Sequence, residues 1–358
     1  MVVFAEPISQ ARFREFLSEL QLRTDRFARE ELEGLFLSRF GSARVPAAPD
    51  DIDPSLRAKY EIIAVDPERV IGIRSVPLPD KQFRMNPLQE MKISSDLKWT
   101  GAGIKVAVLD SGLECDHPDF MSRSILRDSK VKNLDSCDKN GHGTHCTGLI
   151  AGPRVAYGKH PGYGAAPDVT LMIIRALDND LLGDDGDILK AMNLAADLAA
   201  DIIVMCMSAD VPPVAVFEND AAGIKKTSLI IAAAGNDTSS TTVALLGHPA
   251  NAPSIMAVAA VDDNGGPWEY SAGSGRSDVV EVAAPGEGIL SSYFSRVAAY
   301  QRDSGTSQAA AYAAGVAALW AHSDAKYRGE ALREVLRLRA LDLGQPDLLG
   351  KGLVQAPA

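Results

Sequence analysis

Three residue types that can activate a hydroxyl stand in short glycine-flanked segments far apart in the chain. Asp110 follows the apolar run 104–109 and precedes Ser-Gly, His142 lies in Asn-Gly-His-Gly-Thr-His, and Ser307 lies in Ser-Gly-Thr-Ser-Gln. A carboxylate that orients an imidazole, and an imidazole that takes a hydroxyl proton, are what a serine nucleophile needs. Singly, Asp110 would be a strand-end turn residue and His142 a loop histidine. Their joint occurrence favours acyl chemistry at Ser307.

The elements that must position these residues are predicted to be a parallel sheet and its helices. Apolar runs of strand length cover 104–109, 170–174, 202–207, 229–234 and 255–261, and helical segments cover 187–200, 213–226, 306–321 and 329–340. Continuous apolar strands that alternate with helices predict an α/β domain of three layers, α/β/α, with a mainly parallel central sheet. Because such sheets place sites at their carboxyl edge, Asp110 is expected there. Ser307 would lie at the positive end of a helix.

The three segments together resemble the signature blocks of the subtilisin-like serine proteases, in that family's Asp, His, Ser order. The resemblance extends over roughly residues 86–358. It implies a subtilisin-like fold and serine endopeptidase activity without a required cofactor. Within 230–236 it implies that Asn236 supplies the side-chain donor of an oxyanion hole, beside the backbone N–H of Ser307. Cys146, which follows the second histidine of its block, is similar to the free cysteine of proteinase K-like members.

The family pattern also implies a cleft in which an extended peptide lies between two strand segments. The residues that match its rims and pockets are Leu177, Ile188, Cys206, Met207, Ser208, Ala209, Ala234, Gly235 and Gly247. Because the family usually has glycines at Ser208 and Ala209, we expect a narrowed mouth of the first pocket. The segment 178–187 holds five aspartates. A solvated loop that caps a helix and an acidic lip that selects Lys or Arg both remain open.

One residue, Asp119, is linked to a metal by the resemblance. It matches a carboxylate that binds calcium in many relatives, but the segment 152–160, which would complete the site, offers few side-chain oxygens. Calcium takes about six to eight oxygen ligands. The sequence therefore favours a turn role for Asp119 over a calcium site.

The composition restricts the class of protein. The 358 residues are 46% hydrophobic and 23% charged, and 36 basic against 47 acidic residues give a net charge of −11, which argues against a nucleic-acid partner. Peptide or protein substrates are the expected partners, and the oligomeric state is not indicated. The sequence has no apolar run long enough to span a membrane, so we expect no membrane contact. It has no basic start followed by an apolar core, which favours a cytoplasmic location. It has no CxxC pair, so we expect free thiols. Leaderless export stays open.

The first 85 residues are predicted to be a separate pro- or regulatory module, and residues 86–358 the catalytic domain. Spaced apolar residues over 8–40 predict one or two amphipathic helices, followed by short strands. The run 73–79 is similar to the short blocking extension of intracellular subtilisins. We therefore expect the inhibitory segment Val76, Pro77, Leu78 and Pro79 to lie across the cleft.

Three functions follow from these residues. The first is a serine endopeptidase regulated by its N-terminal segment. The second is a peptide acyl transferase or macrocyclase on the same scaffold, which would need a device that excludes water. The third is a non-catalytic peptide-binding pseudoprotease. Retention of all four catalytic groups argues against the third.

Overall fold

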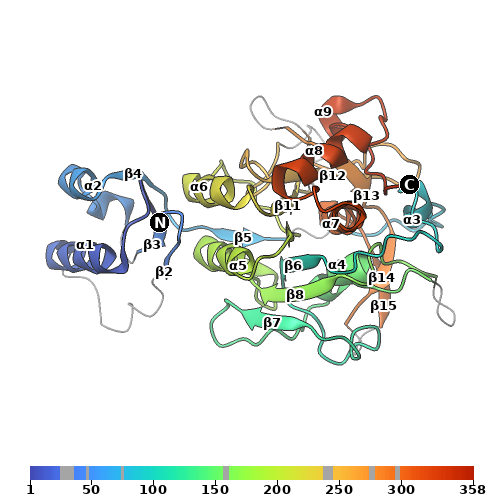
Figure 1. Cartoon of the computed structure of the whole chain (residues 1–358), viewed down its shortest axis with the longest axis horizontal. Helices are drawn as coiled ribbons and strands as arrows, with labels where there is room; N and C mark the ends of the chain where they lie inside the picture. The colour runs from blue at the N-terminus through green and yellow to red at the C-terminus, as the bar shows by residue number, and fades with distance from the viewer. Residues whose placement is uncertain are drawn as a thin grey trace.

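The structure is a computed structural model, and it describes residues 1–24, 36–45, 48–73, 76–155, 161–236, 245–273, 279–294 and 299–358. A small N-terminal module and a larger catalytic domain lie next to each other, joined by one extended segment (Figure 1). Within the described ranges, no helix is long and apolar enough to cross a membrane.

A seven-stranded sheet forms the centre of the catalytic domain. Its order is β13 (Val282–Pro285), β12 (Met256–Val261), β11 (Leu229–Ala233), β10 (Ile202–Met205), β6 (Lys105–Asp110), β8 (Thr170–Arg175) and β7 (Leu126–Ser129). Every neighbouring pair is parallel. The inner strands are buried almost throughout, as their continuous apolar runs predict.

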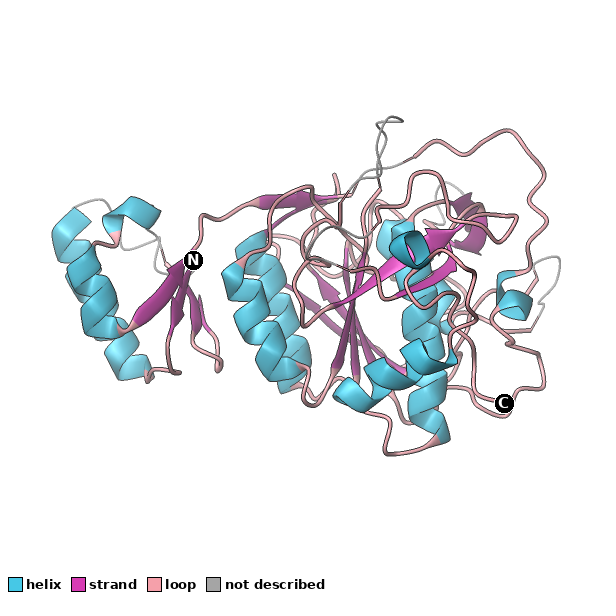
Figure 2. Cartoon of the chain, turned by 90° about the horizontal axis from the view of Figure 1, so that it is seen from above, coloured by secondary structure: helices cyan, strands magenta, loops and turns pink. Residues whose placement is uncertain are grey.

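Helices cover both faces of this sheet, which confirms the predicted three-layer α/β/α architecture (Figure 2). One face carries α5 (Asp185–Asp197) and α6 (Ala215–Ile224), and the other carries α4 (His142–Ala151), α7 (Thr306–Ser323) and α8 (Gly329–Arg339). The short helices are α3 (Pro87–Glu90) and α9 (Pro346–Leu349). A two-stranded antiparallel ribbon, β14 (Ile289–Ser292) and β15 (Tyr300–Asp303), leads directly into α7.

The N-terminal module has its own sheet, helices and core. Its elements are β1 (Val2–Phe4), α1 (Gln10–Thr24), β2 (Phe36–Leu37), β3 (Ser42–Arg44), the 3₁₀ turn η2 (Pro49–Asp51), α2 (Pro54–Tyr60) and β4 (Ile62–Val65). The antiparallel sheet has the order β2-β3-β1-β4, so the connectivity is a split β-α-β. Phe4, Phe16, Leu56 and Tyr60 lie in a core of the module's own. The second half of the predicted helical region, residues 25–35, lies outside the described residues.

The module's sheet faces α6, and its helices lie on the far side (Figures 1 and 2). The compact part of the module ends at β4, and the chain then enters the catalytic domain as β5 (Val70–Gly72). β5 pairs antiparallel with β9 (Leu182–Asp184), with Ile71 opposite Gly183. Part of the segment predicted to belong to the module is therefore an added edge strand of the catalytic domain.

The cysteines differ from the expectation of four free thiols. Cys115 and Cys137 form a disulfide with their Cα atoms 5.4 Å apart, whereas Cys146 and Cys206 are free and buried. The backbone brings the two segments together, because Leu113 N donates to Ser136 O at 3.1 Å. This pairing joins positions 22 residues apart, so short-motif spacing gave no sign of it.

Candidate active site

Asp110 and His142 meet where a strand ends and a helix begins. Asp110 is the last residue of β6, His142 is the first residue of α4, and His142 Nδ1 lies 2.9 and 3.0 Å from the two carboxylate oxygens. Gly143 makes this approach possible, since a Cβ there would clash with the backbone of Gly112 and lie 3.1 Å from Asp110 Oδ1. Because Nδ1 faces the carboxylate, Nε2 lies on the opposite side of the ring.

The two histidines of this segment have opposite electrostatic surroundings. Burial lowers the pKa of His142, but the charge and hydrogen bond of Asp110 raise it, and the net shift is upward. Burial lowers the pKa of His145. The His145 Nε2 lies 3.1 Å from Ile289 O and 3.2 Å from Gln301 O, so its ring ties α4 to the β14–β15 ribbon.

Ser307 lies in the first turn of α7 and shares a pocket with His142 and Asn236. The pocket has a volume of about 290 Å³, and Tyr293, Asp303 and Gln308 also line it. The Ser307 hydroxyl donates to Cys206 O at 2.8 Å. Within the described part of the chain, it makes no hydrogen bond to the imidazole. The base and the hydroxyl therefore face one cavity without being joined.

Asn236 is held by its oxygen end. Its Oδ1 accepts hydrogen bonds from Thr306 N at 3.0 Å and from Thr306 Oγ1 at 2.9 Å. Its Nδ2 lies toward Gly305, where an added Cβ would come within 3.2 Å of it. Thr306 therefore turns the amide nitrogen of Asn236 toward the Gly305–Ser307 end of the pocket.

Two further groups position this site, and neither was predicted from the sequence. Thr306 not only holds Asn236 but accepts the backbone N–H of Gly235 at 3.1 Å. Asp138 is fully buried and accepts from Ser111 Oγ, Gly141 N and Thr144 Oγ1 at 3.1, 3.0 and 2.7 Å. The available signal was a polar residue four positions before His142, close to where a helix N-terminus needs acceptors.

Most of the residues predicted to line the cleft are buried. The buried members are Leu177, Ile188, Cys206, Met207, Ala234, Gly235 and Gly247. Ala209 exchanges two backbone hydrogen bonds of 2.8 Å with His248, next to Gly247. A Cβ on Gly247 would collide with Ser208 Oγ, and one on Gly235 would lie 3.0 Å from the same atom. The Ser208 hydroxyl thus occupies space between the rims that a glycine at 208 would leave empty.

The segment that lies along the cleft is upstream of the predicted one. β5 covers β9, Ile73 N donates to Leu181 O at 3.2 Å, and Ile73 lines the pocket of His142 and Ser307. The predicted segment, Val76, Pro77, Leu78 and Pro79, follows it, with Val76 buried and Leu78 39% exposed. An added edge strand must donate backbone N–H groups, which prolines lack, so 76–79 is a poor pairing segment. The alternating apolar residues Ile71 and Ile73 were the available signal.

Ile71 occupies the outer part of this cleft. It is fully buried and lies opposite Gly183 in the β5–β9 register. Below Gly183 are Leu177 and Ile188, since a Cβ on that glycine would lie 2.7 Å from Leu177 Cδ2 and 3.4 Å from Ile188 Cδ1. In β5, which we call the linker strand, the side chain of Ile71 therefore lies over the apolar pocket that the sequence predicted.

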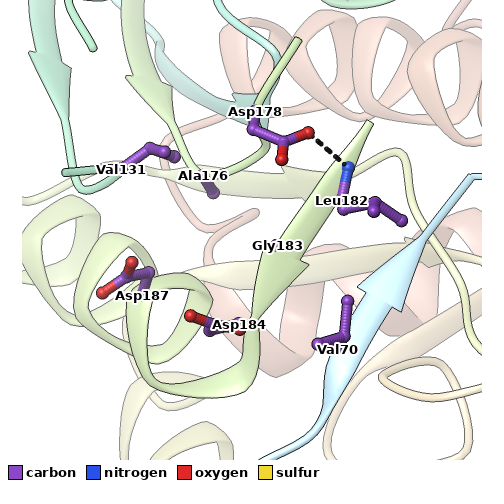
Figure 3. A pocket seen from close by; sticks show the side chains of 8 residues that line it. All are labelled: Val70, Val131, Ala176, Asp178, Leu182, Gly183, Asp184 and Asp187. Carbon is purple, nitrogen blue, oxygen red and sulfur yellow. Dashed lines mark hydrogen bonds between the residues drawn. The ribbon is translucent and has the colours of Figure 1, made fainter. Parts of the chain in front are cut away.

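A second pocket, of about 230 Å³, lies beside β9 and is bordered by Asp178, Asp184 and Asp187, with Val70 of the linker on its rim (Figure 3). Asp178 accepts the backbone N–H of Leu182 at 2.9 Å, a turn role. Asp187 and Asp184 lie 3.2 and 3.9 Å from the guanidinium of Arg44 in the module. The acidic segment therefore combines a local turn role with binding of a basic side chain, and Asp184, at the N-cap of α5, makes no side-chain capping hydrogen bond.

Asp119 is anchored by two tyrosines. Its two carboxylate oxygens accept hydrogen bonds from Tyr163 Oη and, at 3.0 Å, from Tyr300 Oη. A calcium ion at this carboxylate would have to share its oxygens with both donors. Residues 156–160, in the segment predicted to lack suitable ligands, lie outside the described residues.

Comparison with known proteins agrees with this geometry. The sequence profile described as the Subtilase family matches residues 101–352. The chain is 32% identical to the minor extracellular protease Epr of Bacillus subtilis, over 78% of this chain and 41% of Epr. It is 32% identical to thermitase of Thermoactinomyces vulgaris, over 68% of this chain and 84% of thermitase. M-protease of Shouchella clausii is 28% identical over 98% of this chain and 88% of its own length.

Solved structures show the same fold. The crystal structure of a cold-adapted subtilisin-like serine proteinase matches with a TM-score of 0.63 and 24% identity, over 80% of this chain and 96% of that one. The chain spans less than half of Epr but most of thermitase. It therefore belongs to the subtilase family, and its larger domain is that of a subtilisin-like serine endopeptidase.

Proposed function

We propose that this chain is the precursor of a serine endopeptidase that its own N-terminal module holds inactive until the linker is cut. The observation that carries the proposal is the linker strand: β5 pairs with the cleft edge β9, and Ile73 lines the pocket of His142 and Ser307. A peptide that adds a strand to a sheet edge gains backbone hydrogen bonds while its side chains enter pockets. The linker thus has the place that a substrate would take.

The four catalytic groups have separate roles in the proposed reaction. The Ser307 hydroxyl turns from Cys206 O to His142 Nε2 and attacks the substrate carbonyl carbon, while its proton passes to Nε2. Asp110 holds the ring and stabilises the imidazolium. Asn236 Nδ2 and the Ser307 N–H bind the oxyanion. The leaving amine takes the proton from Nε2, and a water molecule repeats the sequence to release the acid.

The docked module supports inhibition through contacts outside the cleft. Ser38 Oγ donates to the buried Asp220 at 3.0 Å, and Asn219 Nδ2 donates to Phe40 O at 2.7 Å. These contacts fix the module's sheet on α6, directly before the chain enters the cleft as β5. While they hold, a substrate cannot pair with β9.

The register also places the expected cut. Ile71 and Ile73 alternate along the cleft, and the chain continues through Arg74 and Ser75, which lie outside the described residues, to Val76. Because Ile73 lines the pocket of Ser307, we expect the cut shortly after it, before Val76.

Intact-mass analysis of the purified full chain tests this proposal. The wild type should separate into a fragment ending between residues 73 and 76 and a catalytic domain that a fluorophosphonate labels. Ser307→Ala should stay intact and unlabelled, while Ser323→Ala, at the other end of α7, should behave as the wild type. A wild-type chain that stays intact yet is fully active, or a Ser307→Ala chain that cuts itself, would overturn the proposal.

The cellular location is a separate proposal. The sequence pointed to the cytoplasm, but a Cys115–Cys137 disulfide supports an oxidising compartment, where such bonds persist. Fractionation of cells that express the full chain, followed by thiol labelling without reductant, distinguishes the two locations.

A further inference from the structure

Two buried thiols lie behind the catalytic carboxylate, and the reaction uses neither side chain. Cys146 and Cys206 are free and fully buried. Their sulfur atoms and a carboxylate oxygen of Asp110 all lie within 4.8 Å of one another. Two thiols and a carboxylate that converge in this way offer three possible metal ligands.

The fold brings the three side chains together from three separate elements. β10 and β6 run parallel with Met205 opposite Leu109, so the next residues, Cys206 and Asp110, lie side by side at the sheet edge. Cys146 is on α4, four residues after His142 and therefore on the same face of that helix. Its sulfur lies 3.9 Å from both ring nitrogens of His142.

We propose that Cys146, Cys206 and Asp110 form a site for a thiophilic divalent cation such as Zn²⁺ or Cd²⁺, and that its occupation turns the protease off. Thiolate ligands select soft cations over Mg²⁺ and Ca²⁺. A tetrahedral site has M–S bonds of about 2.3 Å and M–O bonds of about 2.0–2.2 Å, which sets neighbouring ligand atoms roughly 3.5–4 Å apart. Closing separations of at most 4.8 Å to that range needs small side-chain shifts.

The binding step balances without any redox chemistry. The cation replaces the two thiol protons, which pass to the buffer, and two M–S bonds and one M–O bond form. In the metal-free protein both thiols stay protonated. Burial raises the pKa of Cys146, while for Cys206 the hydrogen bond with Cys146 lowers the pKa, burial raises it, and the net shift is upward.

Inhibition follows from where the carboxylate is needed. His142 Nδ1 lies 2.9 and 3.0 Å from the two Asp110 oxygens in the metal-free site, and a carboxylate drawn toward the cation moves away from the ring. The imidazole then loses its orientation, although the net charge of the cluster stays the same, because the two charges of the cation replace those of the two thiol protons. His142 could no longer take the Ser307 proton, although the nucleophile itself would be untouched.

The first experiment measures binding without activity. Full-length Ser307→Ala, kept free of reductant so that Cys115–Cys137 stays paired, is titrated with Cd²⁺ while the ultraviolet thiolate-to-metal charge-transfer band is followed. We expect saturation at one equivalent. Cys206→Ser or Cys146→Ser on this background should weaken binding about 10–100-fold or more, since even outer partners of a metal site can matter that much. No band, or an equal band in both variants, would overturn the site.

The second experiment measures inhibition and rests on the proposed endopeptidase function. The self-processed enzyme, incubated with Cd²⁺, should lose activity slowly because the site is buried, and EDTA should restore it. Mg²⁺ at the same concentration should have no effect. Each cysteine variant is compared with its own metal-free rate, and equal sensitivity of the wild type and Cys206→Ser would refute the two-thiol site. An inactive protein would refute only the endopeptidase proposal, since the first experiment needs no turnover.

Discussion

The catalytic centre and the contact between module and catalytic domain differ in how strongly they are tied to the core. Asp110 and His142 are buried at the ends of core elements, and Gly143 brings their backbones into contact. The module meets α6 through hydrogen bonds such as Ser38–Asp220 and Asn219–Phe40, beside apolar residues such as Val3 that join the core of the catalytic domain. Water can replace polar partners when such surfaces separate, whereas core packing has no substitute. The difference suits a permanent site and a removable inhibitor.

A substitution in the catalytic centre should lower the rate of peptide hydrolysis without releasing the module. We expect Asp110→Asn to lower kcat by about 10⁴, because an amide no longer fixes the tautomer in which Nε2 accepts a proton. Burial lowers the pKa of His142, but Asp110 raises it above the ordinary 6.5 overall. Since only the neutral ring acts as a base, activity should rise with pH through a midpoint above that value.

The pH profile of kcat/KM on released enzyme checks this prediction. In Asp110→Asn the charge that raises the pKa is gone, so the midpoint should move to lower pH as well as the rate falling. A variant that retains the wild-type midpoint would show that another group sets the pKa of His142.

Removing the oxyanion donor should have the next largest effect. We expect Asn236→Leu to lower kcat about 10²–10³-fold with little change in KM, a range established on subtilisin itself. The reason is that Thr306 orients the amide toward a charge that exists only in the transition state. The exposed Asn264→Leu is the matched control and should match wild-type kinetics. An increase in KM alone would assign Asn236 to substrate binding instead.

The sequence predicts most of the catalytic domain because its signals are local. Buried parallel strands read as unbroken apolar runs, so β6, β8, β10, β11 and β12 fall within one or two residues of their predicted ends. His142 was predicted to lie in a turn but begins α4, since its flanking glycines suggest a loop while Asp138 supplies acceptors to the helix start. That capping is local, since Asp138 lies four residues before His142, but the glycines around His142 mask its signal.

The linker and the disulfide could not be predicted in the same way. The run 70–76 is strand-like in the sequence, as β5 confirms, but the sequence does not show that its partner is β9 of the catalytic domain. The Cys115–Cys137 pair likewise depends on how two loops meet. Both features are set by contacts between distant segments, which one sequence does not display.

Breaking the buried part of the module contact should release the module while leaving the centre intact. Asp220 accepts hydrogen bonds from Ser38 Oγ at 3.0 Å and from Asn193 Nδ2 at 2.6 Å. Asp220→Ala would leave the buried Ser38 hydroxyl of the module without this acceptor, at a cost of about 1–3 kcal/mol, or roughly 5- to 150-fold in module affinity. The lag before full activity in freshly purified protein should shorten accordingly.

The same residue gives the contact a pH dependence of predictable sign. Burial raises the pKa of Asp220 in the docked state, and hydrogen bonds from its neighbours offset this only in part. Docking therefore takes up a proton, so it is favoured at low pH and weakens as pH rises through the raised pKa. We expect a shorter lag at higher pH, and Asp220→Asn should flatten that dependence.

The exposed part of the contact should matter less, and two arginines of the module test this. Arg44 is 24% exposed and lies 2.7 Å from Glu68 and 3.2 Å from Asp187. We expect Arg44→Ala to weaken docking by about 1–2 kcal/mol, or roughly 5- to 30-fold.

Arg39 pairs with Asp197 at 2.9 Å, but both side chains are about half exposed, at 49% and 57%. Arg39→Ala should cost less than about 1 kcal/mol. An equal effect of both on the lag would remove the distinction between buried and exposed contacts.

After Arg44 leaves with the module, the enzyme should show a small preference for substrates with a basic side chain. Once the module departs, Asp184 and Asp187 border an open pocket next to the position that Val70 takes in the docked linker (Figure 3). A Lys at that substrate position can replace the lost guanidinium, although Asp184 is 47% exposed and its attraction is screened. We expect kcat/KM for a Lys peptide over its Gln counterpart to be raised only about 2- to 5-fold, and less at high salt. Asp184→Asn with Asp187→Asn should remove the preference, whereas Asp180→Asn, on the same loop but outside the pocket lining, should keep it. If the double variant retained the preference, the acidic segment would have only its local turn role in substrate binding. The contact with Arg44 would then hold the module without contributing to substrate selection.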